Sequence, residues 1–573
     1  MCRLQEIQPG MDAVSPQLSI KVIPIMTMFS GLFCNNQRSR GRRRNLSVYS
    51  AAACEVLENR ELLADDPVID WNNAALDAIR ISKTAPPVAA RALAIIQTAV
   101  FDSVNSIDRQ FAPFMASVNA DPRASQAAAV AAAAHDTLVA LFPAQKATFD
   151  AKYAASLSLI PDGRPETDGV NVGQAITGMI LAARADDGST KSVTYLPDTR
   201  PGHWNPTPPG FQSPLLPQWP QVRPWIMINN AQFRPAAPPR INSSAYAADL
   251  NMVKQLGSAN STTRTADQTN VAYFWAGGPG TATPPGEWNV IAQIVATQNN
   301  NTLAQNARLF AMLDTTLADA AIVSWESKYF YDLWRPVTAI RLANTDNNPA
   351  TVVDLNWTSL LVTPSFPTYT SGHSTFSGAA AAVLKGFFGT DQMSFVAPSE
   401  VAGVPSRSFT SFSQAAAEAG ISRIYGGIHF NFDNVAGLTS GKQLGAYAVR
   451  NFMKNSYESA SANVSNGELL IAGTSKADRI AIRLTNNNYY ITSNGRQLGQ
   501  FLASNVNTII INAGAGQNIV RTTRVTVPVQ VYGALVQPLT NATKTDSPII
   551  AASRIGNTAT LKALDNLFAG QLL

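Results

Sequence analysis

Residues 325–336 read WESKYFYDLWRP and close a run of apolar residues, spaced three and four apart, that covers residues 305–334. This spacing predicts one long helix, on which Lys328 and Arg335 lie seven residues, or two turns, apart on nearly the same face. Pro336 should end or bend that helix just beyond Arg335. Two cations among so many aromatic side chains are costly to bury without an anion, so the segment predicts that an anion binds nearby.

A second polar segment, FPTYTSGHSTF, covers residues 366–376 and leads into a predicted helix at 377–388. Ser371 and Gly372 therefore stand where a loop enters a helix, and the free backbone amides at a helix N-terminus attract oxyanions. A lone Ser-Gly-His is weak evidence, because this tripeptide often caps a helix with no further purpose. Its weight here comes from the segments that precede and follow it.

The third segment, SRIYGGIHFNFD, covers residues 422–433 and supplies a third cation, Arg423, and a second imidazole, His429. Asp433 lies one helical turn after His429, where its carboxylate can accept a hydrogen bond from one ring nitrogen. The other nitrogen then keeps its lone pair free for a ligand. The three segments together hold the groups of a trap for a tetrahedral oxyanion.

The series Lys-x6-Arg-Pro, Ser-Gly-His and Ser-Arg-x5-His-x3-Asp resembles the signature of the type 2 phosphatidic-acid phosphatase and vanadium-dependent haloperoxidase superfamily. Thr370 stands where that pattern commonly has a proline, a change that removes no contacting group. The resemblance implies a mainly α fold over residues 65–456, a helical bundle of the vanadium chloroperoxidase and acid phosphatase type. The motifs occupy residues 325–433 of it.

For a haloperoxidase, the resemblance implies one vanadate per chain, with His429 as the metal ligand and Asp433 orienting it. His373 takes a proton from hydrogen peroxide, and Lys328 polarises the bound peroxide so that halide can attack it. The products are hypohalous acid and then a halogenated small organic acceptor. Trp325 and Phe366 match aromatic positions that imply an apolar halide site. The residues that would surround the vanadate oxygens are Lys328, Arg335, Ser371, Gly372 and Arg423.

Two alternatives remain open from the sequence. In a soluble acid phosphatase the same site would use His429 as the nucleophile, through a phosphohistidine, with His373 protonating the leaving alcohol. The absence of a run of about 18 apolar residues, and the long stretch of helices before Lys328, favour the haloperoxidase. The second alternative is an exported surface or binding protein with a silent enzyme domain, which the complete set of motif residues disfavours.

Helical periodicity continues upstream of the motifs, and other parts of the chain differ from it. A segment at residues 196–240 contains twelve prolines and cannot be regular helix or central strand. Residues 461–573 contain short β-type runs between Gly and Asn turns, which resemble a degenerate β-roll. Gln517-Asn518 stands where a calcium turn needs aspartate, so calcium binding there is not expected. The predicted upstream helices cover residues 85–105, 124–141, 172–186 and 287–299.

The formal charge of +5 comes entirely from residues 1–48, and the rest of the chain is neutral. A neutral body argues against nucleic acid as a partner, and no membrane span is expected. Residues 1–64 are typical of a leader, and LENRELL at 57–63 resembles an element near the start of exported bacterial proteins, which predicts export. All three cysteines lie in this stretch. The oligomeric state is left undetermined.

Overall fold

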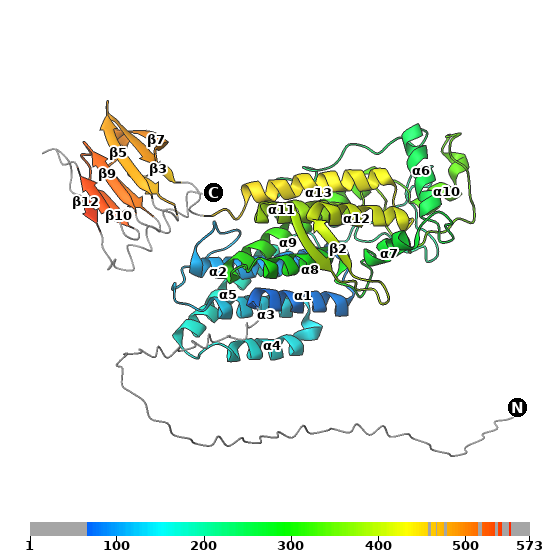
Figure 1. Cartoon of the computed structure of the whole chain (residues 1–573), viewed down its shortest axis with the longest axis horizontal. Coiled ribbons are helices and arrows are strands. Elements are labelled where there is room, and N and C mark those ends of the chain that lie inside the picture. Colours follow the sequence, from blue (N-terminus) through cyan, green and yellow to red (C-terminus); the bar gives the residue numbers. More distant parts are fainter. Residues whose placement is uncertain are drawn as a thin grey trace, which may run out of the picture. The chain divides into compact units, whose positions relative to one another are not determined.

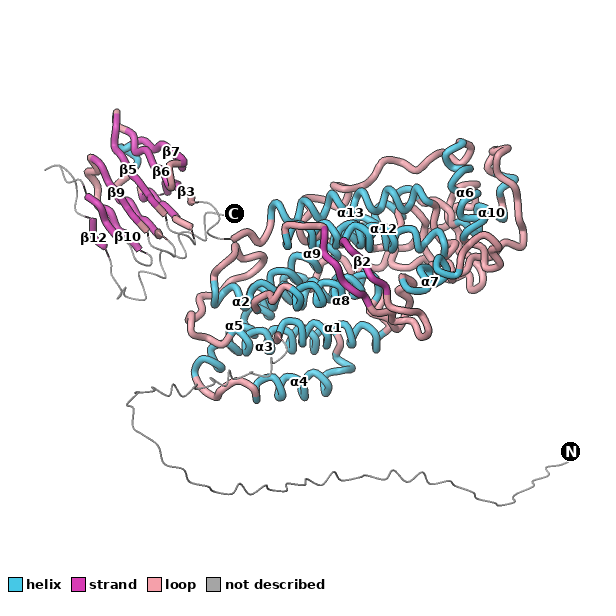
Figure 2. Tube along the Cα trace, viewed as in Figure 1, coloured by secondary structure: helices cyan, strands magenta, loops and turns pink. Residues whose placement is uncertain are grey.

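A computed structural model describes residues 66–455, 460–465, 467–474, 478–513, 518–532, 537–540 and 549–551. The predicted leader and the three cysteines lie outside these residues. Helices make up the part from Asp66 to Asn455, and strands make up the part from Ser461 onward (Figures 1 and 2). The predicted fold class, mainly α with a small β-rich region at the C-terminal side, is confirmed.

The α-helices of the described residues have the following bounds. They are α1 (Pro67–Ser82), α2 (Pro86–Asp108), α3 (Gln126–Leu141), α4 (Lys146–Ser158), α5 (Arg164–Arg184), α6 (Ser244–Leu256), α7 (Ala266–Phe274), α8 (Thr283–Gln298), α9 (Leu303–Tyr331), α10 (Pro336–Arg341), α11 (Gly372–Phe388), α12 (Phe412–Tyr425) and α13 (Asn431–Asn451). Short 3₁₀ turns occur at Pro143–Gln145, Trp219–Gln221, Ala343–Thr345 and Ala503–Asn505.

Helix α9 is the central element of the helical body. It packs against α2 on the side of an N-terminal group of helices, in which α2 also contacts α3 and α5. It packs against α11 on the other side, where α11 contacts α12 and α13 (Figure 1). From Ala304 to Lys328 nearly every residue of α9 is buried, so apolar residues occur on all sides of this helix and not on one face alone. The end of α9 is thereby held rigidly inside the protein.

Helix α2 is as apolar as a membrane span. Among the described residues it alone is both long and apolar enough as a single helix, with a mean hydropathy of 1.3 over its best window. The expectation that no run reaches this length was therefore too strict. In this structure 89% of that window is buried inside the protein, as in the core helix of a helical bundle. Helix α3 and the segment 143–158 are long and apolar enough only when they are counted together as one span, and the chain bends by 119° between them.

The proline-rich segment at residues 196–240 runs along α9 and contains no α-helix or strand, as expected. Asp319 of α9 accepts hydrogen bonds from the backbone amides of Trp225, Ile226 and Met227 at 2.7–2.9 Å. Nearer the end of α9, Glu326 pairs with Arg234. Buried carboxylates thus supply the acceptors that proline-interrupted backbone cannot find in a ladder. Trp204 and Trp219 are buried core residues and do not line an open channel mouth.

Two five-stranded sheets form the β region. Their orders are β12-β10-β8-β4-β3 and β11-β9-β5-β6-β7. The β3–β4, β5–β6 and β6–β7 pairs are antiparallel, whereas from β7 onward successive strands alternate between the two sheets and each of β8 to β12 pairs in parallel within its sheet, as in a β-roll. A separate hairpin, β1 (Gln392–Ala397) with β2 (Arg407–Ser411), belongs to the helical body. The sheet strands are β3 (Ser461–Ser465), β4 (Glu468–Ala472), β5 (Arg479–Thr485), β6 (Asn488–Ser493), β7 (Arg496–Leu502), β8 (Thr508–Asn512), β9 (Ile519–Thr523), β10 (Val529–Tyr532), β11 (Gln537–Thr540) and β12 (Ile549–Ala551).

Asp478 is a buried aspartate in the β region, next to the start of β5. Its carboxylate is buried and accepts hydrogen bonds from Ser493 Oγ at 3.0 Å and Asn494 Nδ2 at 2.9 Å. Its other oxygen accepts from the backbone amide and the hydroxyl of Thr474. Protein donors thus reach both oxygens of this carboxylate. Residues 514–517 themselves lie outside the described residues.

Asp314 in the middle of α9 provides a test of stability against pH. Its side chain is buried, accepts one hydrogen bond from Asn289 Nδ2 at 2.7 Å, and burial raises its pKa to about 8. In the unfolded chain this carboxyl loses its proton near pH 4. Between these values the folded state binds more protons, so stability should fall as pH rises. Asp314→Asn should remove this loss.

We expect the Asp314→Asn protein to unfold at a higher temperature than wild type at pH 8.5 and at nearly the same temperature at pH 4. The gain should be roughly 2 kcal/mol or more at the higher pH, since each unit of pKa shift corresponds to about 1.4 kcal/mol. Asp319→Asn is the matched control on the same helix. Because Asp319 accepts three backbone N–H groups, its amide variant should be destabilised at both pH values. A parallel pH profile for Asp314→Asn and wild type would contradict the argument.

Candidate active site

The imidazole of His429 is fixed from one side by buried oxygen atoms. Its Nδ1 lies 2.8 Å from Oδ2 of Asp433, which follows one turn later in α13, and 3.1 Å from Oγ1 of Thr368. The same carboxylate oxygen accepts from the backbone amide of Phe430 at 3.0 Å and from the Thr368 hydroxyl. The predicted pair of His429 and Asp433 is therefore in contact. Thr368 is a third member that sequence spacing did not indicate.

The protonation pattern of His429 follows from its partners. Arg335 Nη1 lies 3.1 Å from His429 Nε2, and a guanidinium nitrogen can only donate, so Nε2 must be the accepting nitrogen. Nδ1 then carries the proton and donates it to Asp433. Burial, followed by the charges of Arg335, Lys328 and Arg423, lowers the pKa of His429 well below its usual range. At neutral pH the ring is neutral, with one lone pair directed at the cations.

Arg335 does not lie on the helix that carries Lys328, which corrects the expectation of one helix through residue 334. Helix α9 ends at Tyr331, and Asp332 takes a left-handed backbone conformation with φ of 51°. Aspartate tolerates this conformation better than most residues, and here the Asp332 carboxylate is also held by Tyr195 and by His203 Nδ1 at 2.9 Å. The chain turns, and Arg335 becomes the residue that precedes α10. The turn, and not helical periodicity, brings the two cations together.

Both cations are buried and held by backbone carbonyls. Arg335 donates through Nε to Phe366 O at 2.7 Å and through Nη1 to Ile428 O at 2.8 Å. Lys328 donates to Pro367 O at 3.1 Å, to Thr368 O at 3.0 Å and to the carbonyl of Thr370. The ammonium therefore has its three hydrogens on the loop that leads into α11. To contact an oxyanion directly, Lys328 would have to release one of these carbonyls.

Ser371 and Gly372 stand at the start of α11, as expected. Ser371 caps the helix: its hydroxyl oxygen accepts from the Ser374 amide at 3.3 Å and from the Ser374 hydroxyl at 2.9 Å. The Ser371 backbone amide donates to the carbonyl of Asp433 at 3.1 Å, which ties this loop to the His429 segment. Gly372 is the first residue of α11, so its amide has no acceptor within the helix. The two segments thus meet at the positively polarised end of a helix.

His373 and Arg423 lie on the opposite side of the cluster, against the loop after α7. Arg423 donates through Nη1 to Trp275 O at 2.7 Å. A Cβ atom at Gly277 would lie 3.1 Å from His373 Nε2 and 2.9 Å from Pro284, and Gly277 has a φ of +57°. Glycine at 277 therefore leaves the space in which the His373 ring sits. Burial, and then the charge of Arg423, lower the pKa of His373 well below its usual range.

Several polar atoms in this cluster are buried without a hydrogen-bond partner among the described residues. They are Arg335 Nη2, Arg423 Nε, His373 Nε2 and Asp433 Oδ1. Buried donors are normally satisfied, and two of these belong to guanidinium groups. Burial lowers the pKa of Arg335 to about 9 and that of Arg423 to about 10. A small oxyanion beside His429 Nε2 would supply the missing acceptors and the missing negative charge, so the residues present fit vanadate or phosphate.

Trp325 and Phe366 form an apolar wall beside the cations. Their ring centroids are 4.9 Å apart, and the Lys328 ammonium lies 4.9 Å from the Phe366 centroid and 5.8 Å from that of Trp325. The Arg335 guanidinium lies 4.7 Å from the same Phe366 ring. Trp325 donates its indole N–H to Leu215 O at 3.2 Å, so the proline-rich segment holds this wall in place. Both predicted aromatic residues therefore line the cluster and are also part of its packing.

Glu287 is a member of this neighbourhood that sequence reasoning missed. It lies one turn after Pro284 in α8, and its Oε2 is buried without a partner among the described residues. Burial raises its pKa to about 8, Glu400 acts in the same direction, and Arg423 acts in the opposite direction. No motif in the sequence contains Glu287, and only the packing of α8 brings it within electrostatic reach of Arg423. Glu287 is the carboxyl group whose charge raises the pKa of Arg423 against the effect of burial.

The two remaining histidines are held outside the cluster. His135 lies between Asp136 and Asp150, at 2.7 and 2.9 Å, and stacks on Tyr153, as a structural residue does. His203 contacts Asp332 at the turn after α9 and is partly exposed. The cluster around His429 is therefore built from the two histidines that the motifs contain. In the part of the chain that is described, no group of three or more His, Cys, Asp or Glu side chains could hold a metal ion.

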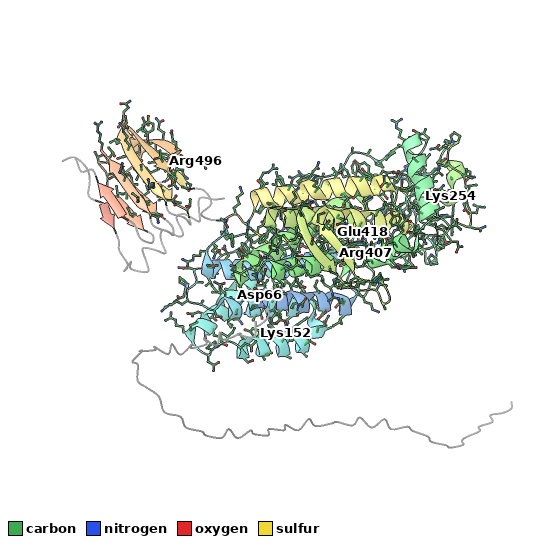
Figure 3. All side chains as sticks on the ribbon, viewed as in Figure 1. Asp66, Lys152, Lys254, Arg407, Glu418 and Arg496 are labelled. Carbon is green, nitrogen blue, oxygen red and sulfur yellow. The ribbon has the colours of Figure 1, made fainter. Side chains whose placement is uncertain are left out.

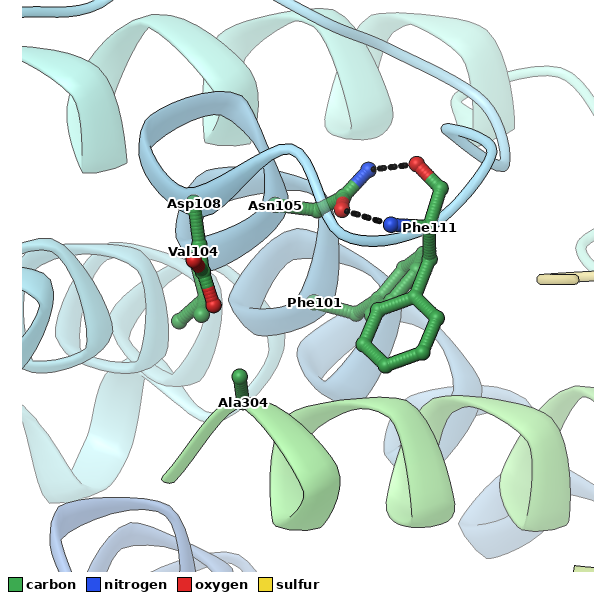
Figure 4. Close-up of a pocket in the computed structure, with 6 residues that line it drawn as sticks. All are labelled: Phe101, Val104, Asn105, Asp108, Phe111 and Ala304. Carbon is green, nitrogen blue, oxygen red and sulfur yellow. Dashed lines mark hydrogen bonds between the residues drawn. The ribbon is translucent and has the colours of Figure 1, made fainter. Parts of the chain in front are cut away.

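A small pocket at the end of α2 involves none of these residues (Figure 4). Asn105 lines it and exchanges two hydrogen bonds with the backbone of Phe111, at 2.8 and 2.9 Å. The space is too tight for a water molecule, so it is a packing defect and not a second site. The other lining residues are Phe101, Val104, Asp108 and Ala304.

The helical bundle thus brings one oriented histidine, three buried basic side chains and a helix N-terminus to one point, which are the groups that a site for a tetrahedral oxyanion needs. Residues 308–457 match the family model described as the VCPO second helical-bundle domain. The chain is 26% identical over 407 residues to the vanadium chloroperoxidase of Curvularia inaequalis. By this match and by the structural relatives that follow, the chain is similar to vanadium haloperoxidases, and residues 308–457 match one of their helical-bundle domains.

Two solved structures extend the comparison to the whole helical body. The first bacterial vanadium-dependent iodoperoxidase is 28% identical, with a TM-score of 0.62 over 69% of this chain and 98% of that one. A holo-type bacterial vanadium-dependent chloroperoxidase, 18% identical, shares the fold with a TM-score of 0.54 over 64% of this chain and 92% of that one. The match to the Curvularia protein covers 56% of this chain and 65% of the relative, which is just under two thirds of its length.

Proposed function

We propose that this protein is a vanadate-dependent haloperoxidase, which oxidises halide with hydrogen peroxide to hypohalous acid and so halogenates small organic acceptors. The observation that carries the proposal is the set of buried donors without partners around the accepting Nε2 of His429. Support also comes from the 28% identical bacterial iodoperoxidase, nearly all of which this chain covers.

Vanadate fits this cluster through its charge and its shape. His429 Nε2 would be its ligand, and Arg335 and Arg423 would donate to its oxygens through the nitrogens that now lack partners. The Ser371 hydroxyl and the Gly372 amide lie at the helix end that favours negative charge. When bound, vanadate supplies a Lewis acid that activates hydrogen peroxide towards halide.

The protein's own residues supply the proton transfer and the charge. His373 is neutral at working pH, because burial and the charge of Arg423 lower its pKa, so its unpaired Nε2 can accept a proton from hydrogen peroxide. Burial, and then Arg335, also lower the pKa of Lys328, whose amino group contacts three backbone carbonyls. By releasing one of these carbonyls, Lys328 would be able to donate a hydrogen bond to an oxygen atom held at this site. Trp325 and Phe366 exclude water at that side and give a large halide an apolar wall.

A soluble phosphatase is the second candidate for the same site, because a phosphate oxygen would satisfy the same donors. Its chemistry would use His429 Nε2 as the nucleophile and His373 as the acid that protonates the leaving alcohol. Burial, and then the charge of Arg423, lower the pKa of His373, so without a bound anion the ring lacks the second proton that an imidazolium acid would give to a leaving group. The aromatic wall beside Lys328 favours a large polarisable anion over an alcohol.

Two assays on the purified full chain test the proposal. The first measures bromination of a dione reporter with hydrogen peroxide and bromide, with and without orthovanadate. The second measures hydrolysis of an aryl phosphate without vanadate. We expect bromination that depends on vanadate and is absent without it. Phosphate hydrolysis with no bromination under any halide would establish the phosphatase instead, and inactivity in both assays with vanadate bound would favour a silent domain.

A further inference from the structure

One sheet of the β region has an inner and an outer surface with opposite character. On β5, Ile480 and Ile482 point inward and join a buried core with Val520 of β9 and Ile491 of β6. Because side chains alternate along a strand, the residues between them point outward. The outward positions of β5 are Arg479, Ala481 and Arg483, and those two arginines are exposed.

The neighbouring strands complete this outer surface. Arg521 of β9 is exposed, points outward and pairs with Ala481 in the parallel register. Arg479 and Arg483 are four residues apart on β5, or roughly 13 Å, and Arg521 lies level with their midpoint on a strand about 5 Å to the side. The three arginine side chains therefore start from a triangle of backbone positions on the outer surface of this sheet. We call this surface, with Tyr490 and Thr492 on β6, the arginine face.

Among the described residues of the β region, no acidic side chain pairs with the arginines of this face. The described residues from 460 onward contain five arginines, with only Glu468 and Asp478 as acids. Asp478 is buried and already accepts hydrogen bonds from Thr474, Ser493 and Asn494. Glu468 belongs to the other sheet. Arg496, labelled in Figure 3, begins β7 in the same sheet and adds charge of the same sign.

Polar groups with hydrogen-bonding capacity lie between the arginines and the sheet edge. On β6 the outward residues are Asn488, Tyr490 and Thr492, and Tyr490 pairs directly with Arg483. Gln500 of β7 pairs with Tyr490 on the far side. The corresponding outward positions of the second sheet are different, because Leu470 and Ile510 there are apolar and buried. Charge and hydrogen-bonding groups are thus concentrated on a single face of the β region.

We propose that the arginine face binds a linear acidic polysaccharide, a chain of sugars that bears carboxylate or sulfate groups. Guanidinium groups bind both anions through paired N–H donors. Amide and hydroxyl side chains match sugar hydroxyls, and the half-buried Tyr490 ring offers a surface for a sugar ring. The triangle spaces its charges on the scale of successive sugar units, so several anions of one chain can be bound together.

Two other anionic partners fit the surface less well. Nucleic acid carries about one charge per 1.7 Å of duplex, and proteins that bind it commonly contact 6–10 phosphates, whereas this face offers three arginines and one tyrosine. An anionic membrane surface is usually bound with apolar side chains that enter it. Between the arginines the outward residues are Ala481 and Thr523, which are too small or too polar for that.

The test uses the full chain at about 0.15 M salt and measures binding to four probes. The probes are polygalacturonate, dextran sulfate, a 30-base-pair DNA duplex and vesicles of phosphatidylcholine with phosphatidylglycerol, with uncharged dextran as the blank. We expect binding to polygalacturonate, dextran sulfate or both, and the two arms identify carboxylate or sulfate as the anion. Tighter binding to the duplex or the vesicles, or no binding to either polysaccharide, would overturn the proposal.

Two triple variants distinguish binding at the arginine face from binding through the overall positive charge of the protein. Replacing Arg479, Arg483 and Arg521 together with glutamine should weaken polysaccharide binding at least tenfold. The control replaces Lys191, Lys385 and Lys442 with glutamine, which removes the same charge from exposed positions of the helical body and should change binding less than twofold. The far-UV circular dichroism spectrum and the unfolding temperature should be equal in both variants and wild type, which shows that both are folded. Equal losses of binding in the two triple variants would refute a defined site.

Discussion

Replacing His429 with alanine is expected to abolish vanadate retention. In the wild type, Nδ1 is held at 2.8 Å by Asp433 and Nε2 accepts from Arg335, so the lone pair is fixed in direction before any ligand binds. Alanine removes the single bond that would anchor vanadium and leaves only hydrogen bonds to its oxygens. We expect vanadate affinity to fall at least a hundredfold, measured as vanadium per chain after gel filtration and by titration of bromination with orthovanadate.

The matched control for this variant is His203→Ala. His203 is also held by an aspartate, Asp332, at 2.9 Å, but it is partly exposed and lies outside the cluster. Its removal should leave vanadium content unchanged. Equal vanadate affinity in wild type and the His429→Ala protein would show that this histidine is not the ligand, whatever the activity of the variant.

His373→Ala should give the opposite pattern, with vanadate retained and turnover lost. His373 Nε2 is buried without a hydrogen-bond partner among the described residues, and its lowered pKa keeps it neutral. The groups that would hold vanadate, His429 with Arg335 and Arg423, are untouched by the change. Because positioned acid–base groups contribute about 10²–10⁴-fold to rate, we expect kcat for bromination to fall by about that factor at saturating vanadate.

A second histidine variant shows whether this loss is specific. His135→Ala removes an imidazole that bridges Asp136 and Asp150 on the surface of α3 and α4, and kcat should stay at the wild-type value. Vanadium content must be measured in the same His373→Ala samples. A variant that has lost both vanadium and activity would assign His373 to binding, and one with full activity would remove it from the proton transfer.

How much of the fold could be read from the sequence depended on the range of the interaction. Helices α2, α3, α8 and α11 begin within a few residues of the predicted positions, because apolar spacing, caps and prolines act locally. The end of α9 was wrong by three residues, since nothing in the local pattern distinguishes Asp332 in a left-handed turn from one more helical residue. That turn is stabilised by Tyr195 and His203, which lie more than a hundred residues earlier.

The β region shows the same division. The runs at β4, β5 and β8 were visible as short apolar segments between Gly and Asn turns, whereas the hairpin of β6 and β7 and strand β9 were not singled out. The pairing of Ala481 with Arg521 joins residues forty positions apart and has no local signal. The arginine face therefore forms only when β5 and β9 pair in the folded protein.

The sequence by itself determined which chemical groups this protein has for binding an oxyanion: the cations, the two histidines and the loop that enters α11. These groups could be identified because each motif is short and its spacing on a helix or at a cap is governed by local geometry. Only the tertiary structure decided how they meet. It placed Arg335 against His429 Nε2 through a chain reversal, added Thr368 and Glu287, and left buried donors without partners. Burial and long-range packing set these features, and neither is encoded in the spacing of neighbouring residues.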